Sequence, residues 1–234
     1  MKVIPVIDYQ QGQVVLAQMG QRDSYQPVSS ALSDNADIHN VMQGILALAP
    51  FKTIYIADLG CIESQQLDRQ LWPTLCHRYP QIEFWLDLGA WAVQWDHVMS
   101  NVLNARPVLG TECYSQITTL TSHLEALNQY KPLLSVDFKD NRILGPCDFL
   151  EEFNAWPDEV IILSLSQVGS NNGPDHHSIN SVRQSFTGKN LFYGGGTRDQ
   201  QDIDLLENLN IKGVLVANGL HSGKFNAAFL QSIS

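Results

Sequence analysis

The chain has 234 residues, of which 44% are hydrophobic and 16% are charged, and its formal net charge is −10. This length and composition can bury one large core and no stretch resembles a linker, so we expect a single domain over residues 1–234. The acidity and the scattered Lys and Arg residues argue against nucleic acid and anionic membranes as partners. No apolar run is long enough to span a membrane and no signal peptide opens the chain, so we expect a soluble, cytoplasmic protein.

Short apolar, β-branched runs alternate with longer segments of helical periodicity, a pattern typical of repeated strand-helix units around a parallel sheet. The eight runs cover residues 2–8, 52–59, 82–89, 106–111, 132–138, 159–166, 190–195 and 212–218. Helical stretches between them include 35–49, 115–128 and 197–208. The alternative, an open doubly wound sheet, lacks its GxGxxG fingerprint here. The sequence therefore predicts an α/β fold, a (β/α)8 TIM barrel.

An internal repeat refines this prediction. The segment FWLDLGA at 84–90 aligns with FYGGGTR at 192–198, and the following strands VLGTECY (108–114) and LVANGLH (215–221) align at a similar separation. The barrel is therefore expected to consist of two similar halves.

Two aspartates end strands that occupy equivalent places in these halves. Asp8 ends the first strand and Asp137 ends the fifth. Catalytic residues of barrels lie at this end of the strands, and a pair of carboxyl groups can divide acid and base roles when their surroundings separate their pKa values. Each aspartate alone is as easily a solvated loop residue, but as a related pair they are candidate catalytic residues.

A glycine-rich turn, Gly194-Gly195-Gly196-Thr197-Arg198, lies between a predicted strand and a predicted helix. Backbone N–H groups in such a turn can hold a phosphate, although a tight turn alone explains the glycines as well. The expected partners of this turn are the residues Ala217, Asn218, Gly169 and Ser170.

Seven segments of the chain, in order, resemble the HisA/HisF family of histidine biosynthesis, and most closely its phosphoribosylformimino-aminoimidazole carboxamide ribotide isomerase branch. They are VIPVIDYQQGQVV (3–15), ADLG (57–60), LGT (109–111), SVDFKDNRI (135–143), SQVGSNNGPD (166–175), YGGGTRDQQDI (193–203) and GVLVANGLHSGKF (213–225). The resemblance covers nearly the whole chain. It places Asp8 and Asp137 on the two catalytic aspartates of the family.

The resemblance implies an Amadori rearrangement, in which an aminoaldose opens and becomes an aminoketose. It implies that one of Asp8 and Asp137 is the general acid and the other the general base, with no cofactor and no metal. Our first hypothesis takes Asp8 as the base and Asp137 as the acid, although the sequence does not give this direction. It also implies a phosphorylated small molecule as the partner, ProFAR in the isomerase branch, with one phosphate held by each half of the barrel.

Several positions depart from the family pattern, mainly around the phosphates. Asp87-Leu88-Gly89 replaces a glycine-rich phosphate loop, although Gly110 and Thr111 remain to bind an anion. A carboxylate at Asp87 would repel a phosphate. The other departures remove a hydroxyl, an acidic turn and positive charges; they are Leu163 with Ser164 beside it, Val168-Gly169-Ser170, Ala217-Asn218, and Leu16.

Asp8, Asp58 and Asp87 end three adjacent predicted strands, so together they are a candidate pocket for a cation or an amine. For Asp58 alone, a structural role is the simpler interpretation. Lys139 is a weak candidate for a Schiff base. Among the remaining polar residues, we interpret His176 and His177 as a solvent-exposed loop pair, and Cys61, Cys76, Cys113 and Cys147 as unpaired thiols without metal-ligand spacing.

Three functions remain open at this point. The first is an isomerase of the family, acting on a phosphorylated aminosugar. The second is a paralogue in another pathway, such as tetrahydromethanopterin-linked one-carbon metabolism, whose substrate bears one phosphate. The third is a ligand-binding barrel without catalysis, against which the retention of Asp8 and Asp137 argues. The oligomeric state does not follow from the sequence.

Overall fold

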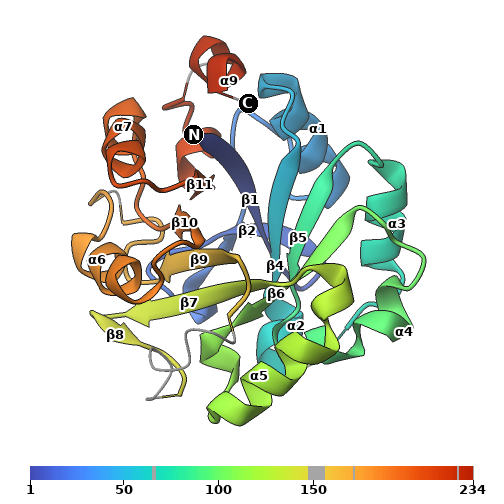
Figure 1. Cartoon of the computed structure of the whole chain (residues 1–234). Helices are drawn as coiled ribbons and strands as arrows, with labels where there is room; N and C mark the ends of the chain where they lie inside the picture. Colours follow the sequence, from blue (N-terminus) through green and yellow to red (C-terminus); the bar gives the residue numbers. More distant parts are fainter. Residues whose placement is uncertain (65–66, 147–155, 171, 226, 234) are drawn as a thin grey trace.

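A computed structural model describes the chain except for residues 65–66, 147–155, 171, 226 and 234. Eight parallel strands form a closed barrel, because the last of them pairs with the first, and helices lie around it (Figure 1). The barrel strands are β1 (Lys2–Gln10), β4 (Thr53–Asp58), β5 (Glu83–Asp87), β6 (Ala105–Gly110), β7 (Leu133–Lys139), β9 (Glu159–Ser164), β10 (Asn190–Gly194) and β11 (Gly213–Val216). The TIM-barrel prediction is confirmed, and each predicted strand lies within a few residues of an observed one.

Three short strands are added to the barrel. Strands β2 (Gln13–Leu16) and β3 (Gln26–Pro27) extend antiparallel from β1, and β8 (Arg142–Ile143) pairs with β7. The β2 and β3 strands bring the first long loop of the chain over the carboxyl ends of the barrel strands. This loop carries the short 3-10 helix η1 (Arg22–Ser24), and its placement matters for the site.

Strand residues alternate between two apolar layers. On β5, Trp85 packs inside the barrel, whereas Phe84 and Leu86 pack in the larger layer between the strands and the helices. The Trp85 ring meets the Phe192 ring of β10 edge to face, with centroids 4.9 Å apart. This alternation has period two, as in any strand, so it also decides which polar residue at a strand end faces the barrel interior.

The predicted helices are present with shorter bounds. Helix α1 (Ile38–Leu48) begins after Asp37, whose Oδ1 accepts hydrogen bonds from two backbone N–H groups of the first turn. Helix α7 (Gln200–Asn208) begins in the same way after Asp199, and α5 spans Ile117–Ala126. Such side-chain caps satisfy N–H groups that have no partner within the helix.

Further helices lie in the other segments between and after the strands, for which the sequence analysis gives no bounds. They are α2 (Leu59–Ser64), α3 (Leu71–Arg78), α4 (Trp95–Met99), α6 (His176–Ser185), α8 (Asn218–His221) and α9 (Ala227–Ile233), with the 3-10 helices η2 (Gly89–Gln94), η3 (Thr111–Cys113) and η4 (Asn128–Tyr130). The interpretation of His176 and His177 as a loop pair is wrong, because they open α6 behind the cap Asp175. Both are exposed, as expected.

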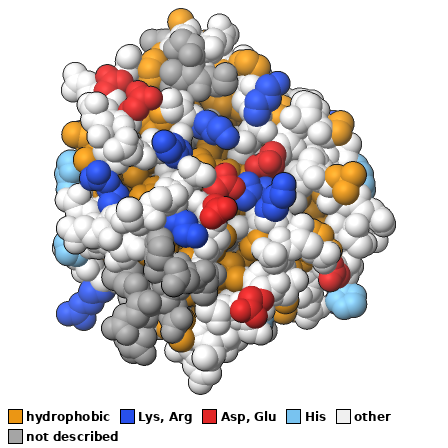
Figure 2. Space-filling view, viewed as in Figure 1, with side chains coloured by type: hydrophobic (Ala, Val, Ile, Leu, Met, Phe, Trp, Pro, Cys, Tyr) orange, Lys and Arg blue, Asp and Glu red, His pale blue; other side chains and the backbone are white. Residues whose placement is uncertain are grey.

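The surface of the molecule mixes charges of both signs. On the face drawn in Figure 2, acidic and basic side chains gather close together near the middle. In the described part of the chain, none of the helices is long and apolar enough to cross a membrane.

Candidate functional site

A cavity opens at the carboxyl ends of the barrel strands. Its wall combines an acidic part, an apolar part and a turn rich in glycine. The acidic part includes Asp8, Asp87 and Glu112, with Arg22 beside them. The remaining lining residues are Val6, Ala17, Tyr25, Tyr55, Ala57, Leu59, Ile62, Leu163, Leu165, Val168, Gly169, Gly194, Gly195, Gly196, Thr197, Leu215, Val216, Ala217, Asn218 and Gly219.

Asp8 faces this cavity from β1. Its side chain is on the interior side, two residues beyond Val6, and it is only 9% exposed. Among the described residues, none donates a hydrogen bond to its carboxylate or forms an ion pair with it. Burial raises the pKa of Asp8 to about 7, which the nearby charge of Arg22 opposes and that of Asp87 reinforces. Asp8 is therefore a carboxyl group that exchanges its proton near neutral pH.

Asp87 faces the same cavity from β5. Its Oδ1 accepts a hydrogen bond from the backbone N–H of Gly89 (3.0 Å), and its Oδ2 accepts one from the hydroxyl of Tyr55 (3.0 Å). Burial raises the pKa of Asp87 to about 6, although both hydrogen bonds lower it. In the register of the sheet, Asp8 lies beside Ala57, and Ala57 lies beside Asp87.

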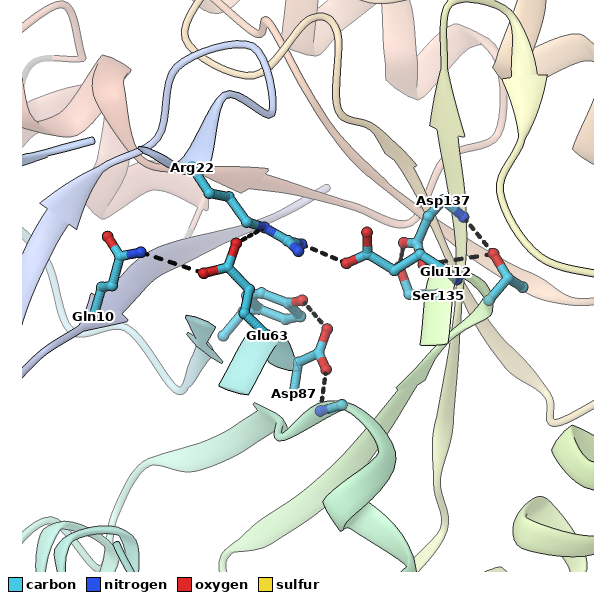
Figure 3. Close-up of polar contacts among 10 residues, drawn as sticks. Gln10, Arg22, Glu63, Asp87, Glu112, Ser135 and Asp137 are labelled. Atoms are coloured by element: carbon cyan, nitrogen blue, oxygen red, sulfur yellow. Dashed lines mark hydrogen bonds and ion pairs between the residues drawn. The ribbon is translucent and has the colours of Figure 1, made fainter. Parts of the chain in front are cut away.

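Arg22 reaches from the first loop across the acidic part of the cavity (Figure 3). Its guanidinium group lies 2.5 Å from Glu112 Oε1 and 3.7 Å from Glu63 Oε1, and Gln10 contacts Glu63 from the other side. The sequence reasoning missed this cluster, because only the fold brings η1, α2 and η3 together. The single available signal was a positive charge in the loop after β2.

Asp137 also lies on the interior side of its strand but is 2% exposed and is not among the residues that line the cavity. It accepts hydrogen bonds from the Ser135 hydroxyl (2.6 Å) and from the Glu112 backbone N–H (3.1 Å). Burial, followed by the charge of Glu112, raises its pKa well above the usual value. Figure 3 shows Asp137 beside Glu112 and Ser135, while Asp87 lies below Arg22. The structure thus brings Asp8 to the cavity together with Asp87, and holds Asp137 behind the turn that carries Glu112.

Gly110 and Thr111, which were expected to bind the first phosphate, pack against the carboxylates of Asp137 and Asp87 instead. The Thr111 hydroxyl accepts a hydrogen bond from the Asp137 backbone N–H (3.0 Å), and Thr111 is fully buried. A side chain on Gly110 would come within 2.8 Å of an Asp137 oxygen and within 3.8 Å of an Asp87 oxygen. Neither residue lines the cavity. Glycine at position 110 leaves the room that the two carboxylates occupy.

Most of the residues predicted to bind the second phosphate do line the cavity: Gly169, Gly194, Gly195, Gly196, Ala217 and Asn218. Gly195 and Gly196 have φ angles of +131° and +71°, and side chains there would lie 2.7 Å and 2.5 Å from the carbonyl oxygens of Ser164 and Gly173. Ser170 is not among the lining residues, because its hydroxyl donates to Gln167. These close approaches place the turn after β10 directly against the end of β9 and the loop that follows it.

Two polar atoms at this end of the cavity have no partner. Thr197 Oγ1 and Asn218 Oδ1 are buried and form no hydrogen bond with the described residues. Buried polar atoms are nearly always paired, so such atoms beside a cavity indicate a missing ligand or solvent molecule. Arg198, which follows Thr197, forms an ion pair with Asp202 (2.8 Å).

The prediction that Asp58 joins Asp8 and Asp87 in one pocket is wrong. Asp58 follows Ala57 and therefore lies on the outer side of β4, where it accepts hydrogen bonds from the Cys61 backbone N–H (2.9 Å) and the Trp72 indole (3.0 Å). These contacts support the structural role that was the simpler interpretation of Asp58. Burial raises the pKa of Asp58 despite these bonds.

Ser164 and Lys139 also lie away from the cavity. Ser164 is on the outer side of β9 and donates a hydrogen bond to Asp175 (3.2 Å), so it does not meet a ligand in the cavity. Lys139 is exposed at the end of β7 and lines a separate groove with Arg22 and Glu112. An exposed lysine lacks the burial that makes a Schiff-base amine reactive.

The described cysteines are free thiols. Cys61 and Cys76 are buried and Cys113 is half-buried, whereas Cys147 lies outside the described residues. In the described part of the chain, no group of three or more His, Cys, Asp or Glu side chains has the geometry to hold a metal ion.

Comparison with known proteins identifies the family. The model of the family described as "Histidine biosynthesis protein" matches residues 2–226. The chain belongs to this family. A relative, the uncharacterized protein MJ0703 of Methanocaldococcus jannaschii, is 29% identical over 230 residues, which cover 95% of this chain and 94% of the relative. Membership in the histidine biosynthesis family confirms the resemblance drawn from the motifs, and the closed barrel agrees with it.

Proposed function

We propose that the protein is an enzyme of aldose-ketose isomerase type that acts on a small molecule carrying a single phosphate. One observation carries the proposal. A single cavity joins Asp8 to the unpartnered polar atoms of Thr197 and Asn218 in the second half of the barrel, while the corresponding donors of the first half are occupied by the protein's own carboxylates.

The second half supports the phosphate end of this proposal. The turn 194–197 follows β10 and the residues Ala217–Gly219 follow β11, the location where barrels commonly bind phosphate. Glycine occupies three consecutive positions here, so the turn has no side chain before Thr197 that could cover its backbone N–H groups. Thr197 Oγ1 can donate a hydrogen bond to a phosphate oxygen, and Asn218 can turn its amide NH2 toward one.

The first half supports the restriction to one phosphate. By the internal repeat, Asp87 is the counterpart of Gly195. The Gly89 N–H donates to Asp87, and the Glu112 N–H donates to Asp137. A phosphate would have to displace two internal carboxyl groups from these N–H groups and remain close to the negative charge of ionised Asp87. Repulsion between close charges near a protein surface amounts to about 4 kcal/mol, which disfavours a second phosphate.

The acidic part of the cavity supports proton transfer. In an Amadori rearrangement, an acid protonates the ring oxygen as the aminoaldose opens, and a base removes the proton from C2, so that no atom is gained or lost. With pKa values of about 7 for Asp8 and about 6 for Asp87, one carboxyl group can hold a proton near neutral pH while the other accepts one. The apolar side chains around them exclude water from the reaction.

The roles of Asp8 as the base and Asp137 as the acid stay a prediction, and the geometry offers Asp87 as the alternative partner of Asp8. In that pair the lower pKa of Asp87 makes it the base and leaves Asp8 as the acid. Asp87 lines the cavity, whereas Asp137 would have to be uncovered by a movement of the turn with Glu112. Turnover by Asp87→Asn and Asp137→Asn distinguishes the two. We expect Asp87→Asn to lose at least about 100-fold in kcat, the usual contribution of general acid-base catalysis. A larger loss in Asp137→Asn would assign the acid to Asp137.

The test of the proposal is an isomerisation assay with two classes of aminoaldose. The purified protein is incubated with ProFAR, which has two phosphates, and with N-substituted 5-phosphoribosylamines, which have one. We expect ketose formation from the second class, and its loss in Asp8→Asn. Preferential conversion of ProFAR would contradict the restriction to one phosphate. Tight binding without any turnover, unchanged in Asp8→Asn, would instead identify a ligand-binding barrel.

A further inference from the structure

We propose that the acidic end of the cavity, formed by Asp8, Asp87 and Glu112, binds a protonated amine of the ligand. This inference rests on the proposed function for the phosphate at the other end, and it names the substrate class: a phosphate monoester that also carries a basic amine.

First, the carboxylate of Asp8 lacks hydrogen-bond donors among the described residues. Its residue is 9% exposed and it lines the cavity, yet none of the described residues donates a hydrogen bond to it. An ionised carboxylate offers about four acceptor positions, and buried polar groups are nearly always hydrogen-bonded. The missing donors must come from whatever fills the cavity.

The second step is the charge balance. Asp8, Asp87 and Glu112 line the cavity, and Arg22 is the one Lys or Arg among its described lining residues. Arg22 is already engaged by Glu112 at 2.5 Å and by Glu63 at 3.7 Å. The carboxylates therefore exceed the positive charge available to them. A cationic ligand group would supply both the hydrogen-bond donors and the missing charge.

The third step is the space between the carboxylates. Ala57 separates Asp8 from Asp87 in the register of the sheet, and it also lines the cavity. Asp8 and Asp87 lie on the two strands that flank β4, and two such strands lie roughly 10 Å apart. Two side chains that point inward from them leave a gap of a few ångströms. The side chain at this level of β4 is the single methyl group of Ala57, and the Tyr55 hydroxyl reaches Asp87 from the level below. An ammonium group, with three donors, fits between two carboxylates in this way.

A metal ion is the alternative occupant, and the geometry disfavours it. Metal sites need several ligand atoms around one point, and no group of three or more acidic, His or Cys side chains in the described residues provides this. A neutral hydroxyl would satisfy the acceptors of Asp8 without balancing the charge. The experiment therefore compares an amine with a hydroxyl directly.

The probes are ω-aminoalkyl phosphates with chains of about two to six carbons, and the ω-hydroxyalkyl phosphates of the same lengths. An alkylammonium has a pKa near that of lysine, about 10, so it is charged at neutral pH. Affinities are measured by isothermal titration calorimetry at one pH and one ionic strength. At the best chain length, we expect the amine to bind at least about tenfold more tightly than the hydroxyl compound.

The decisive variant is Asp87→Asn, with Glu83→Gln as its matched control. Glu83 lies on the same strand at the opposite end, where it contacts Trp85 Nε1 and Arg106, so its loss removes one negative charge without touching the cavity. We expect Asp87→Asn to remove most of the preference for the amine and Glu83→Gln to retain it. Glu112→Gln provides a second variant if Asp87→Asn does not fold, as judged by circular dichroism.

Failure of this inference can be told from failure of the proposed function. If hydroxyalkyl phosphates bind but the amines bind no better at any length, or keep their preference in the folded Asp87 and Glu112 variants, the amine site is overturned and the phosphate site stands. If inorganic phosphate and the hydroxyalkyl phosphates do not bind, the phosphate site fails. Propylammonium then decides the amine site alone: binding that Asp87→Asn or Glu112→Gln weakens supports it, and no binding overturns it.

Discussion

The backbone N–H of Gly89 donates a hydrogen bond of 3.0 Å to the side chain of Asp87, two residues before it. At the corresponding place in the second half of the barrel, the chain has Gly195 and no side chain at all. One half of the barrel thus keeps an open turn, whereas the other places its own carboxylate against the N–H group.

Replacing Asp87 by glycine should restore an anion site in the first half. The change frees the Gly89 N–H and removes a negative charge, at a cost of about 1 kcal/mol for glycine in a strand. We expect the phosphate stoichiometry measured by titration calorimetry to rise from one to two. Asp87→Asn is the matched control, because it removes the charge but keeps an oxygen against Gly89. An equal gain in both variants would show that charge alone excludes the second phosphate.

Removing the positive charge of Arg22 should raise the pKa of Asp8 above its value of about 7. The guanidinium group lowers this pKa by favouring the ionised carboxylate. The measurement is a carboxyl carbon NMR titration of Arg22→Gln. Arg198→Gln serves as the control, because Arg198 is paired with Asp202. An unchanged or lowered pKa of Asp8 in Arg22→Gln would contradict the assigned position of Arg22.

The contribution of Asp8 and Asp87 to the stability of the folded protein should fall as the pH rises from about 4 to about 7. Asp8 and Asp87 have folded-state pKa values of about 7 and about 6, above the value of 3.8 expected in the unfolded chain. The folded state therefore binds more protons in this window, and its advantage is present at low pH and lost as the pH rises through these values. Each pKa unit corresponds to about 1.4 kcal/mol.

Asp8→Asn tests this directly, because an amide cannot ionise. At pH 8 we expect the free energy of unfolding of the variant to exceed that of the parent by up to roughly 4 kcal/mol, so the variant unfolds at a higher urea concentration. At pH 4 we expect little difference between the two. Urea unfolding curves at several pH values provide the measurement. Parallel pH dependences in the two proteins would show that Asp8 titrates at its ordinary pKa.

Gly169→Ala should destabilise the protein more than Gly12→Ala. Both glycines have positive φ angles, +72° and +84°, so each substitution carries a similar backbone strain. A methyl group on Gly169 would lie 2.4 Å from the Ala17 carbonyl oxygen, whereas none of the described atoms lies within 4 Å at Gly12. We expect a loss of about 1 kcal/mol for Gly12→Ala and about 2 to 4 kcal/mol for Gly169→Ala.

The second measurement on these variants is phosphate affinity. Gly169 lines the cavity next to Ala17 and Asn218, so displacement of its loop should weaken phosphate binding, whereas Gly12 lies away from the cavity. Equal phosphate affinity in the folded Gly169→Ala variant would argue against a role for this loop in the phosphate site.

The sequence by itself determined the barrel. A short β-branched run that ends in a polar or small residue predicts each strand, and this pattern depends only on local sequence. The family motifs and the repeat between 84–90 and 192–198 are visible in the sequence alone. They identify Asp8, the glycine turn and the departure at Asp87. The bounds of helices such as α2, α3 and α4 do not follow from the sequence, because these helices are short and their packing against the strands compensates for weak periodicity.

Only the tertiary structure decided which polar side chains meet. Asp58 and Ser164 end strands like Asp8 and Asp87, but the alternation along each strand turns them to the outer side, where they bind Trp72 and Asp175. Which strand-end residue faces inward depends on the stagger of the closed barrel, and the sequence does not state this stagger.

The cluster of Arg22 and Glu112 is the clearest case. These residues lie 90 positions apart in the chain, on the 3-10 helices η1 and η3, and no motif of the sequence relates them to each other. Barrel closure brings their elements over the same opening, where the ion pair tunes Asp8 and the Glu112 backbone N–H binds Asp137. The sequence supplied the carboxylates, and the fold determined which of them a ligand can reach.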